Sequence, residues 1–239
     1  MRIRVIVPIA TGRFDEEVKK EFAAYANPDT QIEVVHLDKG PESIESEYDE
    51  ALATPDILNK VKEAEDQGAD GAIIDCFGDP GVRAAREIAG IPVIGAGQPS
   101  MLLASMLGQK FSIITVLKNV VPIIYNLAKI YGVYEKLASV RHINIPVLEL
   151  TDKDRVKAAI YQEMLKAIEV DEAHVLVLGC TGMMGLSQEL YSMLRERGYD
   201  VPVVDPAAAS LKIMETMVRL KVKQSKETYM PPPVKERKN

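Results

Sequence analysis

The chain has 239 residues, of which 47% are hydrophobic and 27% are charged, a balance typical of a soluble globular protein. Its formal net charge is −6 and no stretch gathers Lys and Arg into a basic stripe, so no nucleic-acid partner is expected. The N-terminal apolar run is too short for a signal peptide, and no run approaches the roughly 18 apolar residues that span a bilayer, so we expect a cytoplasmic protein without a membrane segment.

Short β-rich apolar runs alternate with helical patterns along most of the chain, which favours right-handed βαβ units and an α/β fold. Strands are expected near Ile3–Pro8, Ile32–Leu37, Ala72–Asp75, Pro92–Gly95, Phe111–Thr115, Val140–Ile145, Val175–Gly179 and Pro202–Val204. Helices are expected at Asp15–Ala26, Asp56–Gln67, Gly81–Ala89, Pro122–Tyr131, Asp154–Glu169, Leu186–Arg197 and Ala207–Val222.

The two halves of the chain repeat one pattern. Residues 68–78 and 171–182 each contain an apolar strand that ends on a cysteine, and each is followed by a helix and a short Pro-Val strand. The sequence therefore predicts two pseudo-symmetric lobes, each with a mostly parallel sheet flanked by helices and with the active site between them. Lobe 1 would comprise residues 1–97 and 207–224, and lobe 2 residues 98–206. Residues 225–239 would form a C-terminal tail without a chemical role.

The two cysteines, Cys76 and Cys180, are the candidates for chemistry, because ligands of open parallel sheets bind beyond the carboxyl ends of the strands. A following helix would lower the thiol pKa through its positive N-terminal dipole. One thiolate would then remove a proton from a carbon, and the other thiol would return a proton to the opposite face without a cofactor. Backbone N–H groups at Gly78 and Gly182 could hold the enolate oxygen.

Plainer interpretations exist for these residues. A cysteine that ends a buried strand is more often a small core residue, and two cysteines can also form a disulfide. The repeated context of the two cysteines favours a paired chemical role instead. The three histidines, His36, His142 and His174, are isolated and lack metal-ligand spacing, so we expect no metal site.

The residues around both cysteines resemble the aspartate/glutamate/hydantoin racemase superfamily over nearly the whole chain, to about Val222. The segment Asp75–Gly81 resembles the first-cysteine signature of hydantoin and allantoin racemases, and Leu178–Met183 resembles the second. Glu45–Ala51 and Pro92–Gly95 are supporting, less specific matches. The resemblance implies two α/β lobes with the site between them, and a metal-free homo-oligomer.

Departures from the family pattern bear on the substrate. Amino-acid racemases of the superfamily usually carry Cys-Asn-Thr at the first cysteine, whereas Cys76–Gly78 reads Cys-Phe-Gly. Hydantoin racemases commonly have Asn-Pro-Asn-Thr after the first strand, whereas Val7–Thr11 reads VPIAT, so Pro8 matches and Thr11 is a candidate replacement donor. The decarboxylases of the superfamily lack the first cysteine, and Cys76 argues against that activity.

The predicted function is cofactor-independent racemisation of a small molecule, a 5-substituted hydantoin, with Cys76 and Cys180 as the catalytic pair. The candidate substrate-binding residues are Pro8, Thr11, Ser46, Phe77, Gly78, Asp79, Gln98, Thr115, Thr181 and Gly182. A simpler role for Ser46 and Asp79 is to cap a helix. The polar groups of Gln98 and Thr115 could simply form hydrogen bonds with loop backbone groups.

Three alternatives remain open. Racemisation of aspartate, glutamate or another amino acid would require cationic groups for carboxylates, and only Arg83 is near a cysteine motif. A maleate-isomerase-like enzyme would use one cysteine to attack a double bond. A two-lobed ligand-binding protein without catalysis would also hold its ligand between lobes, and its cysteines would be incidental. Thiol alkylation separates the last case from the enzymes.

Overall fold

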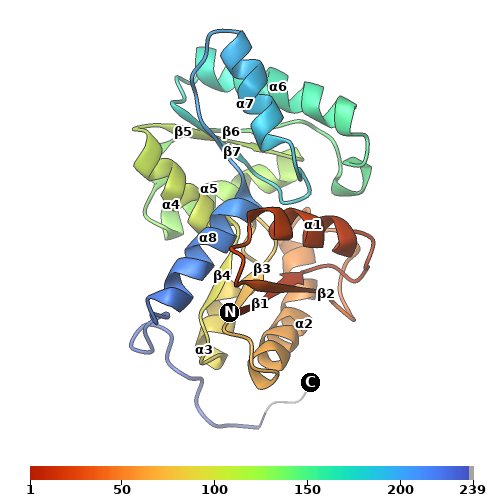
Figure 1. The fold of residues 1–239 in the computed structure, drawn as a ribbon, viewed down its shortest axis with the longest axis vertical. Helices are drawn as coiled ribbons and strands as arrows, with labels where there is room; N and C mark the ends of the chain where they lie inside the picture. The colour runs from red at the N-terminus through yellow and green to blue at the C-terminus, as the bar shows by residue number, and fades with distance from the viewer. Residues whose placement is uncertain (237–239) are drawn as a thin grey trace.

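The computed structural model describes residues 1–236 and shows two α/β lobes arranged along the long axis of the molecule (Figure 1). Each lobe contains a four-stranded sheet whose paired strands are all parallel. The strand order is β2-β1-β3-β4 in lobe 1 and β6-β5-β7-β8 in lobe 2. The two orders follow the same pattern, and the predicted α/β class with two similar lobes is confirmed.

The elements of lobe 1 are β1 (Arg2–Val7), α1 (Asp15–Tyr25), β2 (Gln31–His36), α2 (Glu47–Asp66), β3 (Gly71–Ile74), α3 (Val82–Ile88) and β4 (Val93–Gly95). The chain then passes through α4 (Gly97–Leu107) into lobe 2. Its elements are β5 (Phe111–Thr115), α5 (Val121–Ile130), β6 (Leu137–His142), α6 (Lys153–Glu169), β7 (Val175–Leu178), α7 (Ser187–Glu196) and β8 (Val203–Val204). Three short 3-10 helices occur at Lys118–Val120, Tyr134–Lys136 and Val147–Glu149.

The last helix, α8 (Pro206–Arg219), returns from lobe 2 and packs against α1, α4, β3 and β4 (Figure 1). It begins where Asp205 accepts hydrogen bonds from the backbone N–H groups of Ala207 and Ala208, at 3.0 and 3.1 Å. Such an N-cap satisfies donors that the first helical turn leaves unpaired. The chain therefore crosses between the lobes twice, at α4 and at α8.

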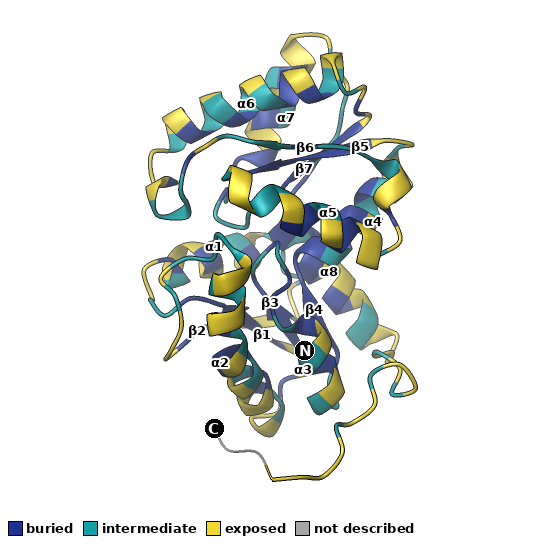
Figure 2. Ribbon diagram, turned by 180° about the vertical axis from the view of Figure 1, so that it is seen from behind, coloured by how far each residue is buried: buried dark blue, intermediate teal, exposed yellow. Residues whose placement is uncertain are grey.

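The central strands are buried on both faces, because helices cover both sides of each sheet. Strands β3, β5 and β7 are buried at every residue, whereas the edge strands β2 and β6 are mostly half-buried or exposed. Figure 2 shows the buried residues running through both sheets and the inner faces of the helices. This packing fixes the carboxyl ends of the central strands, where the cysteines follow.

Two helices differ from the sequence prediction by more than a few residues at an end. Helix α2 begins at Glu47 rather than Asp56, because Ser46 caps it by accepting a hydrogen bond from the Asp49 N–H at 3.2 Å, and Pro55 is accommodated inside it. Helix α4 was not predicted, and its sequence contains Gly97 and Pro99. Both lie in its first turn, where the missing N–H of Pro99 is harmless because it would have no partner within the helix.

Candidate active site

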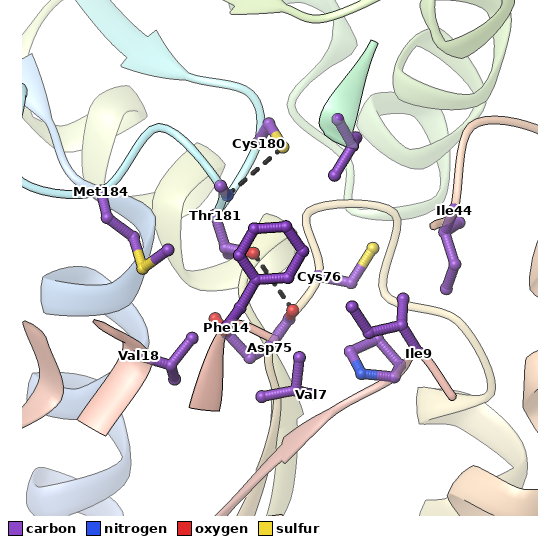
Figure 3. Close-up of a pocket in the computed structure, with 13 residues that line it drawn as sticks. Val7, Ile9, Phe14, Val18, Ile44, Asp75, Cys76, Cys180, Thr181 and Met184 are labelled. Atoms are coloured by element: carbon purple, nitrogen blue, oxygen red, sulfur yellow. Dashed lines mark hydrogen bonds between the residues drawn. The ribbon is translucent and has the colours of Figure 1, made fainter. Parts of the chain in front are cut away.

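Cys76 and Cys180 occupy corresponding positions in the two lobes. Cys76 follows β3, and Cys180 follows β7, the equivalent strand of lobe 2. Both are free, half-buried thiols, and both line one cavity between the lobes (Figure 3). That cavity has a volume of about 500 Å³, including space open to solvent. The structure thus brings the two predicted catalytic residues to a single site.

The walls of this cavity are mainly apolar. Lobe 1 and its loops contribute Val7, Ile9, Phe14, Val18 and Ile44, and lobe 2 contributes Val147 and Met184. A second cavity, of about 370 Å³, shares Ile44, Cys76, Cys180 and Thr181 with the first. The two cavities are therefore adjoining parts of one site around the two thiols.

Six of the ten predicted substrate-binding residues line these cavities. Pro8 and Gly182 line the first, Ser46, Phe77 and Gly78 line the second, and Thr181 lines both. Thr181 also donates its hydroxyl to the backbone oxygen of Asp75 at 3.1 Å, which ties the loop after Cys180 to the loop that carries Cys76. Ser46 lines the second cavity and also caps α2.

The other four predicted residues line neither cavity and have protein partners instead. Thr115 is fully buried and donates to the Gly179 oxygen at 3.1 Å. The Gln98 side chain accepts from Arg86 at 2.8 Å, and the Thr11 hydroxyl accepts from the Arg13 N–H at 3.3 Å.

Asp79 is the fourth of these residues. It is buried, and it accepts hydrogen bonds from the backbone N–H groups of Gly97 and Gln98 and from the Tyr131 hydroxyl. The sequence analysis gave helix capping as a simpler role for Asp79. The structure shows that Asp79 caps α4, a helix that begins 18 residues later. These contacts hold the strand ends and the cysteine loops in place.

Three acidic residues of the site were missed by sequence reasoning: Glu45, Glu50 and Asp75. Glu45 accepts from the Val147 N–H at 2.6 Å and so joins the loop before α2 to lobe 2. Burial raises the pKa of Glu50 to about 7, and the charge of Asp79 adds to the effect. Two features of the sequence could have pointed to these residues. Asp75 is adjacent to Cys76, and Glu45 and Glu50 both lie in the segment Glu45–Ala51, which resembles the family.

Burial raises the pKa of both thiols, that of Cys180 to about 12 and that of Cys76 well above its usual range. Nearby acidic groups add to this, chiefly Glu50 for Cys76 and Asp75 for Cys180. The Gly182 N–H opposes the effect by donating to the Cys180 sulfur at 3.3 Å. The two thiols therefore tend to remain protonated at neutral pH.

The expected lowering of the thiol pKa by helix dipoles is wrong. Helices α3 and α7 begin at Val82 and Ser187, a loop beyond each cysteine, whereas a helix dipole acts mainly within the first turn. The groups that do stabilise a thiolate are local backbone donors, the N–H groups of Gly78 and Gly182. Lys153 adds a smaller favourable charge for Cys180.

Residues 1–236 contain no group of three or more His, Cys, Asp or Glu side chains placed to hold a metal ion. Within the same range, no helix combines the length and the apolar character needed to cross a membrane.

Comparisons with known proteins identify relatives of this chain. The chain is 37% identical over 238 residues to a hydantoin racemase from Pseudomonas sp. (strain NS671), which covers 99% of this chain and 94% of that protein. The solved allantoin racemase from Klebsiella pneumoniae has 36% identity and a TM-score of 0.93, with 100% of this chain and 96% of that chain covered. The allantoin racemase from Pseudomonas fluorescens has 33% identity and a TM-score of 0.94, with both chains covered at 100%.

The fold, the two thiols in one cavity and the relatives named above together identify this chain as an isomerase of the racemase class. The family model described as Asp/Glu/Hydantoin racemase matches residues 3–214. The chain belongs to the Asp/Glu/hydantoin racemase family, and within it to the hydantoin and allantoin racemase type.

Proposed function

We propose that this enzyme racemises 5-substituted hydantoins by a two-base mechanism, with Cys76 and Cys180 on opposite faces of the C5 carbon. One observation carries the proposal: two thiols from different lobes line the same cavity. The relatives named as hydantoin and allantoin racemases support the substrate class.

In this mechanism one cysteine thiolate breaks the C5–H bond and forms an S–H bond. The electron pair of the C–H bond moves into an enolate whose charge lies on the C4 carbonyl oxygen. The opposite cysteine then breaks its S–H bond and returns a proton to the other face of C5. The two sulfurs have exchanged protonation states, so the next turnover runs in the opposite direction and needs no cofactor.

The lining of the site favours a ring without carboxylates over an acidic amino acid. Among residues 1–236, neither cavity beside the thiols is lined by a Lys or an Arg. Recognition of a free carboxylate usually uses such cations, often through paired hydrogen bonds. A neutral hydantoin ring instead suits apolar walls with a few polar groups.

The test uses Cys76→Ser and Cys180→Ser with the separate enantiomers of a 5-substituted hydantoin in deuterated water. Each variant should lose racemisation, because a serine hydroxyl is a far weaker base than a thiolate. The remaining thiolate should still exchange the C5 hydrogen of one enantiomer with retention, and the two variants should prefer opposite enantiomers. Spontaneous exchange is subtracted with enzyme-free samples.

Near-wild-type racemisation by either serine variant would overturn the two-cysteine mechanism. Exchange of the same enantiomer by both variants would refute the facing arrangement of the thiols. Racemisation of aspartate or glutamate but not of any hydantoin would replace the substrate class and leave the mechanism standing.

The proposal also includes a homo-oligomeric state and a cytoplasmic location, both expected from the sequence and its resemblance. Light scattering of the purified full-length chain measures the first. Cell fractionation measures the second.

A further inference from the structure

Asp75 is a buried carboxyl group inside the proposed active site. It lies between the end of β3 and Cys76, and only 4% of its surface is exposed. Its Oδ1 atom is buried and has no hydrogen-bond partner among residues 1–236. Because buried polar atoms are nearly always paired, such an atom calls for an explanation. Asp75 lines the apolar cavity together with both cysteines, which places this residue beside a ligand bound there (Figure 3).

The carboxyl group has no counterpart in lobe 2. Gly179 precedes Cys180 as Asp75 precedes Cys76. A Cβ atom at Gly179 would lie 2.6 Å from the Ile113 Cγ2 atom and 3.0 Å from the Ile114 oxygen, so the packing leaves no room for a side chain there. The position before the cysteine therefore carries a carboxyl in lobe 1 and none in lobe 2, which breaks the pseudo-symmetry of the site.

The surroundings of Asp75 favour its neutral form. Burial raises its pKa to about 7, and the charge of Asp205, at the start of α8, adds to the effect. Glu21 on α1 is a further acidic neighbour that interacts with both aspartates, and Cys180 lies across the cavity. A carboxyl of this kind is protonated in a large fraction of molecules near neutral pH. It then both donates and accepts hydrogen bonds.

Building on the proposed function, we infer that Asp75 binds the N3–H and C4=O edge of the hydantoin ring through a paired hydrogen bond. Its O–H donates to the C4 oxygen, and its other oxygen accepts from N3–H. When a thiolate takes the C5 proton, negative charge develops on that C4 oxygen. The neighbouring acid stabilises the charge while keeping its own proton, as a donor placed for a developing oxyanion does.

This contact would also set specificity. A hydantoin presents an N–H and a C=O side by side because its ring holds the amide in the cis form. A free amino acid has no such edge. Asp75 would thus select cyclic amides and ureides, and it would act on both enantiomers because the N3–C4 edge is the same in each.

A binding experiment tests the contact without turnover. The probe is 5,5-dimethylhydantoin, which has no C5 hydrogen and cannot racemise, together with its 1-methyl and 3-methyl derivatives. Calorimetry with the wild-type enzyme should show affinity lowered tenfold or more by 3-methylation and little by 1-methylation. Asp75→Leu should bind the probe weakly and lose the discrimination, which gives a double-mutant cycle for the contact.

Two outcomes would overturn the inference. Equal discrimination against the 3-methyl compound by wild type and Asp75→Leu would show that another residue reads this edge. No discrimination by the wild-type enzyme would show that the edge is not read at all, whatever the state of the variant. Wild-type binding with this discrimination but without racemisation of any hydantoin would instead contradict the proposed function alone.

Steady-state kinetics of two variants distinguish whether Asp75 acts as a neutral acid or as a carboxylate base. Loss of one oxyanion donor typically lowers kcat by about 100- to 1,000-fold, and we expect that loss for Asp75→Leu. Asp75→Asn keeps a donor and an acceptor of similar shape, so its kcat should fall by no more than about tenfold, with KM changing less than in Asp75→Leu. Asp66→Leu, an exposed substitution on α2, is the matched control. An Asp75→Asn variant as inactive as Asp75→Leu would refute the neutral-acid role, and a fully active Asp75→Leu would refute any role.

Discussion

Tyr131 donates its phenolic hydrogen to Asp79 and so joins the end of α5 in lobe 2 to the loop that follows Cys76 in lobe 1. The same carboxyl accepts the N–H groups of Gly97 and Gln98, at 2.7 and 2.8 Å, in the first turn of α4. Asp79 has a φ of 53°, a left-handed conformation that is uncommon outside glycine. Its three partners compensate for that conformation and fix the cysteine loop relative to both lobes.

Replacing Tyr131 with Phe should therefore affect both stability and activity. A hydrogen bond to a charged group contributes about 1.5–3 kcal/mol, so the free energy of unfolding should fall by roughly that amount. We also expect kcat to fall several-fold, since the Cys76 loop loses its tie to lobe 2. Thermal unfolding and racemisation rates measure the two effects. Tyr134→Phe is the control, because the Tyr134 hydroxyl has no hydrogen bond among the described residues; equal effects of the two substitutions would contradict this assignment.

The pH dependence of the rate follows from the raised thiol pKa values. Since burial keeps both thiols protonated at neutral pH, the thiolate fraction, and with it kcat/KM, should rise about tenfold per pH unit below about pH 7. Above about pH 7 the rise should flatten, because Asp75, whose pKa burial raises to about 7, loses the proton that it donates to the C4 oxygen. The rate should fall again once both sulfurs are ionised, because the second must supply a proton. The two apparent pKa values would belong to the coupled pair. A corrected rate that is already flat below about pH 7 would contradict this scheme.

Glu21 should make stability depend on pH in an unusual direction. Burial and the charge of Asp205 raise its pKa far above 4.5, so the folded state holds a proton that the unfolded chain releases. Stability contributed by this group is therefore lost as pH rises above about 5. Glu21→Gln keeps an acceptor for the Gly185 N–H, now 3.0 Å from Glu21, and should raise Tm at about pH 8 relative to wild type.

The gain in Glu21→Gln should shrink or vanish at about pH 5, where the glutamate is protonated anyway. Glu16→Gln, an exposed substitution on the same helix, should give no such pH-dependent difference. A constant difference between wild type and Glu21→Gln at both pH values would show that charge is not the cause.

Removal of metals should leave the rate unchanged, because the two thiols supply both the base and the acid of the proposed mechanism. Exhaustive dialysis against a chelator, followed by a racemisation assay in chelator-treated buffer, is the measurement. Restoration of a lost rate by a divalent ion would reject the metal-free mechanism, and restoration by pyridoxal phosphate would reject the cofactor-free one.

Sequence reasoning located the cysteines because strand ends and repeats are local patterns. The ends of β3 and β7, the Pro-Val strands and the order of elements all followed from apolar runs and their spacing. The repeated context of Cys76 and Cys180 predicted their pairing, and the family resemblance agreed with it. These features depend on residues near each other in the chain.

The parts that were missed depend on contacts distant in sequence. Helix α4 has its first N–H groups satisfied by Asp79, and Asp79 itself is aligned by Tyr131, which no local pattern connects. The thiol pKa values likewise depend on burial between lobes and on Glu50 and Asp75. The expectation that the helix after each cysteine lowers the thiol pKa considered only neighbouring residues, and it therefore gave the wrong direction.

The return of α8 to lobe 1 has a consequence for how the protein is made. Met214 on this helix packs so closely on β3 that a Cβ atom at Gly71 would lie 2.4 Å from its sulfur, and Leu211 and Met214 are fully buried there. During synthesis, the sheet of lobe 1 therefore lacks its covering helix α8 until every strand of the second sheet has been synthesised. We expect the lobe made first to be completed last, with its apolar surface in need of protection until α8 has emerged from the ribosome.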